Sequence, residues 1–318
     1  MSPRARTYVF VALAAVAASA VLVAAVAFTR TSSPHAQVAA RPAPTLVLDL
    51  GVRTDREAVA LRRANTLYAA GKRVEAGRIF ARYRSVAAEV GAALAAWPDG
   101  TVARLETLAD RYPSSALVLL HLGLARVGGG DTVGAQAAWR QALARDPDTE
   151  PAVQAESLLY PRFAPQRPAF VPSFQLPRAI ARLPAPRQFA LLARDARGGD
   201  VRAKLLYGSA LQRLGRSVSA EREFAAAARL APEDAEAQVA AAVGRFSKAK
   251  PAVAFSQLGP LARHFPHSQS VRFHLGELLI WIGQLKEARR QLGLGVAAGP
   301  STQLGRTARE FLKQLPAK

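Results

Sequence analysis

The chain has 318 residues and no cysteine, which excludes disulfides, thiolate metal sites and a cysteine nucleophile. Aromatic residues make up only 7% of it, which is low for a β-sandwich or barrel core, whereas its alanine-rich runs favour helices because alanine is the best helix former. The formal net charge of +20 favours anionic partners, but the arginines are scattered as on ordinary solvated helix faces and no nucleic-acid-reading motif accompanies them. We therefore expect an all-α protein and no nucleic-acid partner.

The N-terminal segment predicts a membrane anchor. We interpret residues 9–29 as a transmembrane signal-anchor helix, because an uncharged apolar run of this length would rise about 30 Å, the hydrocarbon thickness of a bilayer. Arg4 and Arg6 precede the run, so the tail 1–8 is expected to stay in the cytoplasm while the rest of the chain crosses. The expected protein is a single-pass cell-membrane protein with its folded part extracytoplasmic.

A cleaved signal peptide is the alternative, which would make the protein a secreted one. Ala25-Val26-Ala27 resembles a cleavage site, but the apolar run is longer than the usual signal-peptide core of about 7–15 residues. Residues 30–54 follow as a predicted flexible linker, because their first half (RTSSPHAQVAARPAP) is polar, rich in proline and without helical periodicity.

A period of 34 residues organises the C-terminal half of the chain. Pro232, Pro266 and Pro300 keep this spacing, and Gly208 and Gly276 stand two periods apart. A fixed period of this size is typical of stacked helix-turn-helix units. The spacing predicts a C-terminal block over 187–318 that ends in a capping helix.

Within one unit, residues 201–234, each marked position has a physical reason. Gly208 lies midway along the first helix, where it lets the second helix approach closely. Gly215 lies in the turn, where a positive φ is often needed, and Pro232 ends the second helix.

An N-terminal block is predicted over 55–159. Its best unit is 116–149, and 57–84 is a weaker copy. Residues 105–123 also align without gaps to 258–276, with identities at Leu108, Pro113, His121, Leu122 and Gly123.

A proline-rich insert, 160–186, separates the two blocks. Its seven prolines prevent a continuous helix, and three phenylalanines, Phe163, Phe170 and Phe174, lie among them. The insert is either a structured loop that packs its phenylalanines on neighbouring helices or a partner-docking or hinge segment.

The pattern resembles the tetratricopeptide repeat family, closely over 116–149 and 201–302 and partially over 57–115. One departure is Ala241-Ala242, where the family has Leu-Gly. The resemblance implies an all-α solenoid of helical hairpins, preceded here by one transmembrane helix, that binds other proteins through a superhelical groove.

In that family, four positions of each first helix line the groove. Carried onto this chain and completed by the neighbouring tryptophan, they give the following candidate partner-binding residues: Leu120, Leu124, Val127, Leu205, Gln212, Val239, Val243, Phe246, Phe273, Ile280 and Trp281. The same rule adds the following residues: Leu117, Arg202, Ser209, Glu236, Ser270 and Glu277. The set is mainly apolar, which argues against an acidic C-terminal peptide as ligand and suggests an apolar helix or strand, or the chain's own proline-rich insert. The alternative is that these residues simply pack the superhelix.

No catalytic, cofactor or metal site is predicted. His264 and His267 straddle Pro266 without a carboxylate to complete a metal set, and the glycines at 128–130 lack the Lys-Ser/Thr ending of a phosphate loop. We expect a membrane-anchored, non-enzymatic scaffold or adaptor that binds proteins in envelope assembly. The alternative is a basic module that binds an anionic envelope polymer or lipid surface, with a steep dependence on salt.

Overall fold

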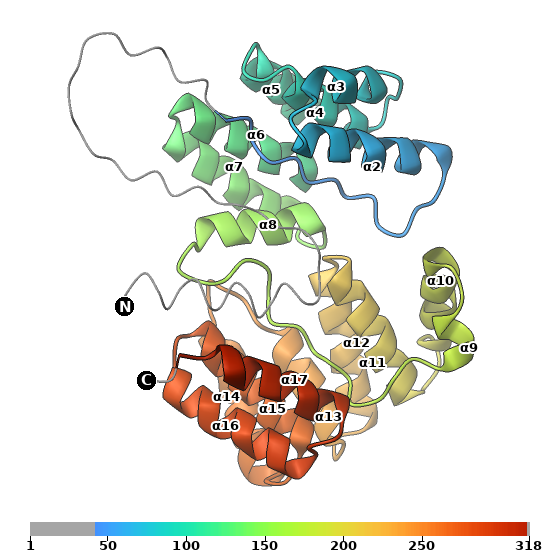
Figure 1. The fold of residues 1–318 in the computed structure, drawn as a ribbon, viewed down its shortest axis with the longest axis vertical. Helices are drawn as coiled ribbons and strands as arrows, with labels where there is room; N and C mark the ends of the chain where they lie inside the picture. Colours follow the sequence, from blue (N-terminus) through green and yellow to red (C-terminus); the bar gives the residue numbers. More distant parts are fainter. Residues whose placement is uncertain (1–41, 317–318) are drawn as a thin grey trace, which may run out of the picture.

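The computed structural model describes residues 42–316, which fold as an array of helices joined by short turns (Figure 1). The helices are α2 (Arg56–Ala69), α3 (Arg73–Phe80), α4 (Val86–Ala95), α5 (Thr101–Arg111), α6 (Ala116–Gly129), α7 (Thr132–Arg145), α8 (Glu150–Leu159), α9 (Arg178–Ala181), α10 (Ala185–Asp195), α11 (Val201–Arg213), α12 (Ser217–Leu230), α13 (Ala235–Gly244), α14 (Ala252–His264), α15 (Gln269–Trp281), α16 (Leu285–Ala298) and α17 (Gln303–Gln314). No β-strand occurs between residues 42 and 316, as the all-α prediction requires. The predicted tail 1–8 and anchor 9–29 lie outside the described residues, and within 42–316 no helix combines the length and apolarity needed to span a bilayer.

Most of the helices pair into hairpins, and each helix in the first position of a repeat begins at a capping side chain, including α8 and α17, which have no second helix. The first helices are α2, α4, α6, α8, α11, α13, α15 and α17, and their capping residues are Asp55, Ser85, Ser115, Thr149, Asp200, Asp234, Ser268 and Thr302. Each cap accepts a hydrogen bond from a backbone N–H of the first helical turn, which would otherwise have no partner. The caps from Asp200 to Thr302 follow the 34-residue period, whereas Asp55, Ser85 and Ser115 are 30 residues apart. The shorter spacing explains why the repeat pattern is weaker before residue 116.

Glycine allows the two helices of a hairpin to pack closely, as the sequence predicts. A Cβ on Gly208 would lie 2.3 Å from the ring of Phe224 on the neighbouring helix, so only glycine fits there. Gly215 has a φ of 71° in the turn between α11 and α12, a conformation that costs glycine little. Helix α12 ends at Leu230, two residues before Pro232.

We call α2–α8 the N-terminal block and α11–α17 the C-terminal block. The surface that the first helices of either block form together is its inner face. The structure corrects one predicted boundary in the N-terminal block: the flexible linker expected over 30–54 is ordered in its last part. Leu46 and Leu50 are buried in the same apolar cluster as Leu61 and Tyr68, and the Tyr68 hydroxyl donates to the carbonyl of Pro44 at 2.6 Å. Burial of these leucines stabilises an extended conformation that polar linker residues would not hold.

The insert predicted over 160–186 is a structured segment without long helices. It contains only the single turn α9, and α10 begins at Ala185, inside the predicted insert, because Pro186 is tolerated in the first turn of a helix. Figure 1 shows the segment in yellow-green, leaving α8 and crossing the C-terminal block towards α9.

Polar contacts fix the two blocks to each other. Arg216 is the N-cap residue of α12, but its side chain does not accept a hydrogen bond from the first turn of that helix. The carboxylate of Asp148, just before α8, does so instead and accepts from the N–H groups of Val218 and Ser219 at 2.9 and 3.0 Å. Arg216 donates to the carbonyl of Asp148 and to both carboxylate oxygens of Asp49, each of these two at 2.8 Å. Segments before α2, before α8 and before α12 therefore meet at one junction.

Candidate functional site

Each block carries an extended segment of the chain on its inner face. The first strap, residues 43–50, lies against α2 and α6 of the N-terminal block. The second strap, residues 163–174, is part of the proline-rich insert and contacts α11, α13 and α15 of the C-terminal block. The sequence-based suggestion that the insert itself is a ligand of the inner face therefore agrees with the observed contacts.

The C-terminal block binds the second strap through its backbone. The N–H of Phe170 donates to Gln212 at 3.0 Å, and the N–H of Val171 donates to His274 Nε2 at 2.9 Å. The N–H of Ser173 donates to Glu236, whose other oxygen accepts from the Ser173 hydroxyl at 2.7 Å. Side chains of the inner face thus accept the backbone hydrogen bonds of the strap, as the carbonyls of a neighbouring strand do in a sheet.

One aromatic side chain anchors the second strap. Phe170 is 3% exposed, and its ring packs edge-on to Phe224 at 5.3 Å and stacks on His274 at 5.2 Å. Burial of such a ring stabilises the bound strap by about 1.5–3 kcal/mol. At the end of the strap, the ring of Phe174 lies under the Arg202 guanidinium at 4.3 Å.

A buried histidine accepts a strap N–H in each block. In the C-terminal block, His274 Nδ1 donates to the carbonyl of Ser270 at 2.8 Å, which leaves Nε2 free to accept from Val171. In the N-terminal block, His121 Nδ1 donates to the carbonyl of Leu117 at 2.7 Å and Nε2 accepts from Val47 at 3.1 Å. Burial lowers the pKa of each of these two histidines to about 4, so both are neutral at physiological pH.

Glu277 is an acid that the second strap satisfies only in part. It is 6% exposed, and its Oε2 atom has no hydrogen-bond partner. Burial raises the pKa of Glu277 to about 8, so the carboxyl is largely protonated at neutral pH.

A second polar cluster lies where the strap leaves α8. Lys248 is fully buried, and its Nζ donates to the Ser157 hydroxyl at 2.9 Å and to the carbonyl of Ala164 at 2.8 Å. Glu156 accepts from Arg167 Nε at 2.7 Å and from the Lys248 backbone at 3.1 Å. Burial lowers the pKa of Lys248 to about 7.

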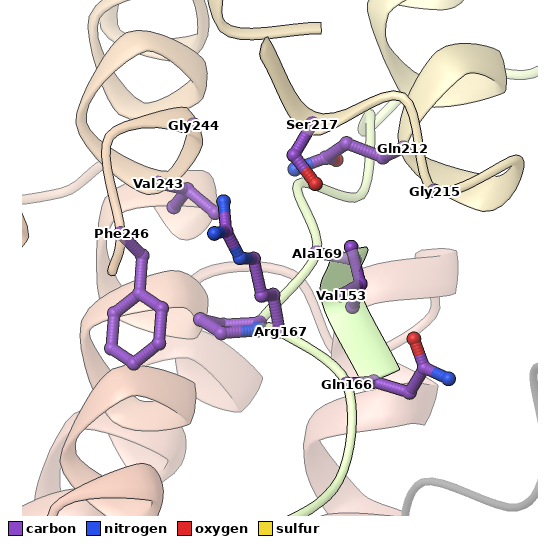
Figure 2. A pocket seen from close by; sticks show the side chains of 11 residues that line it. Val153, Gln166, Arg167, Ala169, Gln212, Gly215, Ser217, Val243, Gly244 and Phe246 are labelled. Atoms are coloured by element: carbon purple, nitrogen blue, oxygen red, sulfur yellow. The ribbon is translucent and has the colours of Figure 1, made fainter. Parts of the chain in front are cut away.

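A cavity of about 50 Å³ lies beside Arg167 (Figure 2). Its walls come from the strap, α8 and the C-terminal block, and include the following residues: Val153, Gln166, Arg167, Ala169, Gln212 and Phe246. The cavity has room for water molecules but not for a substrate. Within residues 42–316, no three His, Cys, Asp or Glu side chains gather as a metal site would require.

The structure brings most of the predicted groove residues of the C-terminal block together under the second strap. Gln212 binds it directly, while the following share the apolar cluster of Phe170: Leu205, Val239, Val243, Phe246 and Trp281. Phe273 and Ile280 pack with Val171 in the adjoining cluster.

The predicted residues of the N-terminal block divide differently. Leu120 and Leu124 belong to the cluster that Val47 of the first strap covers, whereas Val127 is 45% exposed. The sequence analysis does not single out His121 and His274 as binding residues. The gap-free alignment of 105–123 with 258–276 pairs these two histidines, and that pairing was the available signal.

Comparisons with known proteins give one match to a family and several similar solved structures. Residues 117–149 match the sequence model of the tetratricopeptide repeat family. No curated protein matches the chain. Similar solved structures include yeast Tom70, which is 13% identical with a TM-score of 0.36 over 87% of this chain and 52% of its own. A tetratricopeptide repeat protein from Parabacteroides merdae is 14% identical, with a TM-score of 0.34 over 81% and 98% of the two chains.

The complex of pHSP90 with the TPR2AB domain of yeast Sti1 is also similar, at 13% identity and a TM-score of 0.31 over 81% of this chain and 96% of that one. This chain spans about half the length of Tom70. The helical hairpins and the repeat at 117–149 make the described part of the chain a tetratricopeptide-like helical solenoid.

Proposed function

We propose that this protein is a non-enzymatic scaffold that binds a protein partner through the inner faces of its two helical blocks. The observation that carries the proposal is the second strap, a peptide segment held on the inner face by side-chain acceptors and one aromatic anchor. A surface that binds an extended segment of its own chain has the chemistry to bind one from another protein.

We further propose that the scaffold works in the cell envelope, held there by residues 9–29. The apolar run and the preceding Arg4 and Arg6 support this location, and the basic charge of +20 suits an envelope rich in anionic groups. Protease added to spheroplasts should digest the helical blocks. Protection of the blocks until detergent is added would contradict an extracytoplasmic location.

Photo-crosslinking from the inner face tests the binding function. Val127, on the first helix α6, is a predicted groove residue that stays 45% exposed, and Val133, on the second helix α7, is 82% exposed. A photoreactive phenylalanine analogue at Val127 should give a discrete protein adduct in cells, identified by mass spectrometry. The same analogue at Val133 is the matched control and should not. Equal adducts from both positions, or none from either, would count against binding through the inner face.

A further inference from the structure

The contacts of the second strap define what kind of segment its binding face accepts. Gln212 and His274 accept from the backbone N–H groups of two consecutive strap residues, Phe170 and Val171. Any extended peptide without proline at those two positions offers the same two donors. The requirement for a particular sequence comes from the ring of Phe170, which fills the space between Phe224 and His274.

The second strap is not held by structure of its own. Apart from the one-turn helix α9, the segment from 160 to 184 forms no helix, and its conformation depends on contacts with the C-terminal block and with Glu156 and Ser157 of α8. A segment of this kind can leave the face without unfolding a helix of its own.

Glu277 indicates that the strap is an incomplete ligand. Its carboxyl group lies beside the Ala169 backbone of the strap, and its Oε2 atom is buried without a partner, although buried polar atoms are nearly always paired. A side-chain amide or hydroxyl from another segment would satisfy this atom. The binding face therefore has unused capacity for recognition when its own strap is bound.

We propose that the inner face of the C-terminal block is a binding site for an extended segment of a partner protein, which replaces residues 166–174 and places an aromatic ring where Phe170 lies. The second strap then acts as an internal competitor that keeps the site filled until such a partner arrives. This inference rests on the proposed scaffold function and specifies its ligand. The strap is covalently attached, so its effective concentration is about millimolar and only a well-matched partner displaces it.

A labelled peptide with the sequence of residues 163–175 (FAPQRPAFVPSFQ) tests the proposal on the full chain in detergent. Three chains are compared by fluorescence anisotropy: the wild type, Phe170→Ala, which removes the anchor of the strap, and Ser173→Pro, which removes both the N–H and the hydroxyl that donate to Glu236. The peptide should bind Phe170→Ala at least about tenfold more tightly than the wild type, because the internal competitor is weakened. Ser173→Pro should lie between the two. A peptide with alanine in place of its central phenylalanine should not bind.

Equal affinity of the peptide for all three chains would overturn the proposal. So would failure to bind either variant while both keep the cooperative thermal unfolding of the wild type. Ser173→Pro leaves the apolar core filled, so it still reports if Phe170→Ala does not fold. An adduct at Val127 combined with no peptide binding would leave the scaffold function standing and remove only this inference.

Discussion

The two strap-binding histidines should control how stability depends on pH between 5 and 6. The pKa of His121 and of His274 falls from 6.5 to about 4 on folding, so in this range the unfolded chain binds protons that the folded chain does not. Stability therefore rises with pH from about 4 to 6.5, with a slope of about 1.4 kcal/mol per pH unit for each histidine. The full effect of each histidine is about 3 kcal/mol.

Glu277 acts in the opposite direction. Its pKa rises from 4.5 to about 8 on folding, so its contribution to stability is present below pH 4.5 and is lost as the pH rises towards 8. These three groups together contribute a slope of about +1.4 kcal/mol per pH unit between pH 5 and 6. Glu236, whose pKa burial also raises, acts in the same direction as Glu277.

The double variant His121→Gln/His274→Gln keeps Glu277 and removes both histidines. Its slope should be lower than that of the wild type by about 2.8 kcal/mol per pH unit, and each single variant should lower the slope by about 1.4 kcal/mol per pH unit. Urea unfolding followed by circular dichroism at pH 5.0, 5.5 and 6.0 measures the slope directly, and a constant offset in stability does not affect it. A double variant with the wild-type slope would refute the assignment of neutral, strap-bound histidines.

Three further predictions concern packing and the contacts between blocks. Gly208→Ala should destabilise the folded chain by about 1–3 kcal/mol, because the added Cβ would meet the buried Phe224 ring. The control Gly293→Ala, in α16 with open space around it, should stabilise the folded chain by about 0.5–1 kcal/mol. Urea unfolding measures both changes. Asp49→Asn breaks the two hydrogen bonds from Arg216 to the Asp49 carboxylate and should lower the free energy of unfolding by about 1–3 kcal/mol. An unchanged urea midpoint would show that the first strap does not stabilise the junction. The pKa of Lys248 falls from 10.5 to about 7 on folding, so between these pH values the unfolded chain binds a proton that the folded chain does not, and stability rises with pH. Lys248→Met should flatten this rise. A variant that kept the rise would contradict a lowered pKa for Lys248.

The helical hairpins could be predicted from the sequence because each repeat encodes its own local structure. A turn glycine such as Gly215, a helix-ending proline such as Pro232 and a small residue at a close contact such as Gly208 act within one unit of the chain. Their recurrence at a fixed period makes the interpretation secure, since a chance pattern would not return in phase.

The two straps could be predicted only in part, because their contacts join distant parts of the chain. Val47 is 74 residues from His121, and Val171 is 103 residues from His274. The phenylalanines of the insert indicate that it packs on helices, whereas the polar residues before the first strap predict a flexible linker over 30–54. The strap's own residues, TLVLDL, are apolar enough to be buried, and that local change in composition was the signal to follow.

The matching histidines indicate that the chain contains two copies of one arrangement, an extended strap followed by the helical hairpins that bind it. The first strap precedes the N-terminal block and the second precedes the C-terminal block, and in each a first-helix histidine donates to the carbonyl four residues before it and accepts from the strap. This order also explains the break in the repeat. The caps Thr149 and Asp200 are 51 residues apart, seventeen more than the period, and the second strap lies between them, where α8 lacks the second helix of a hairpin. The proline-rich insert therefore precedes the C-terminal block as the first strap precedes the N-terminal block, and the seventeen extra residues between the caps Thr149 and Asp200 make room for the second strap.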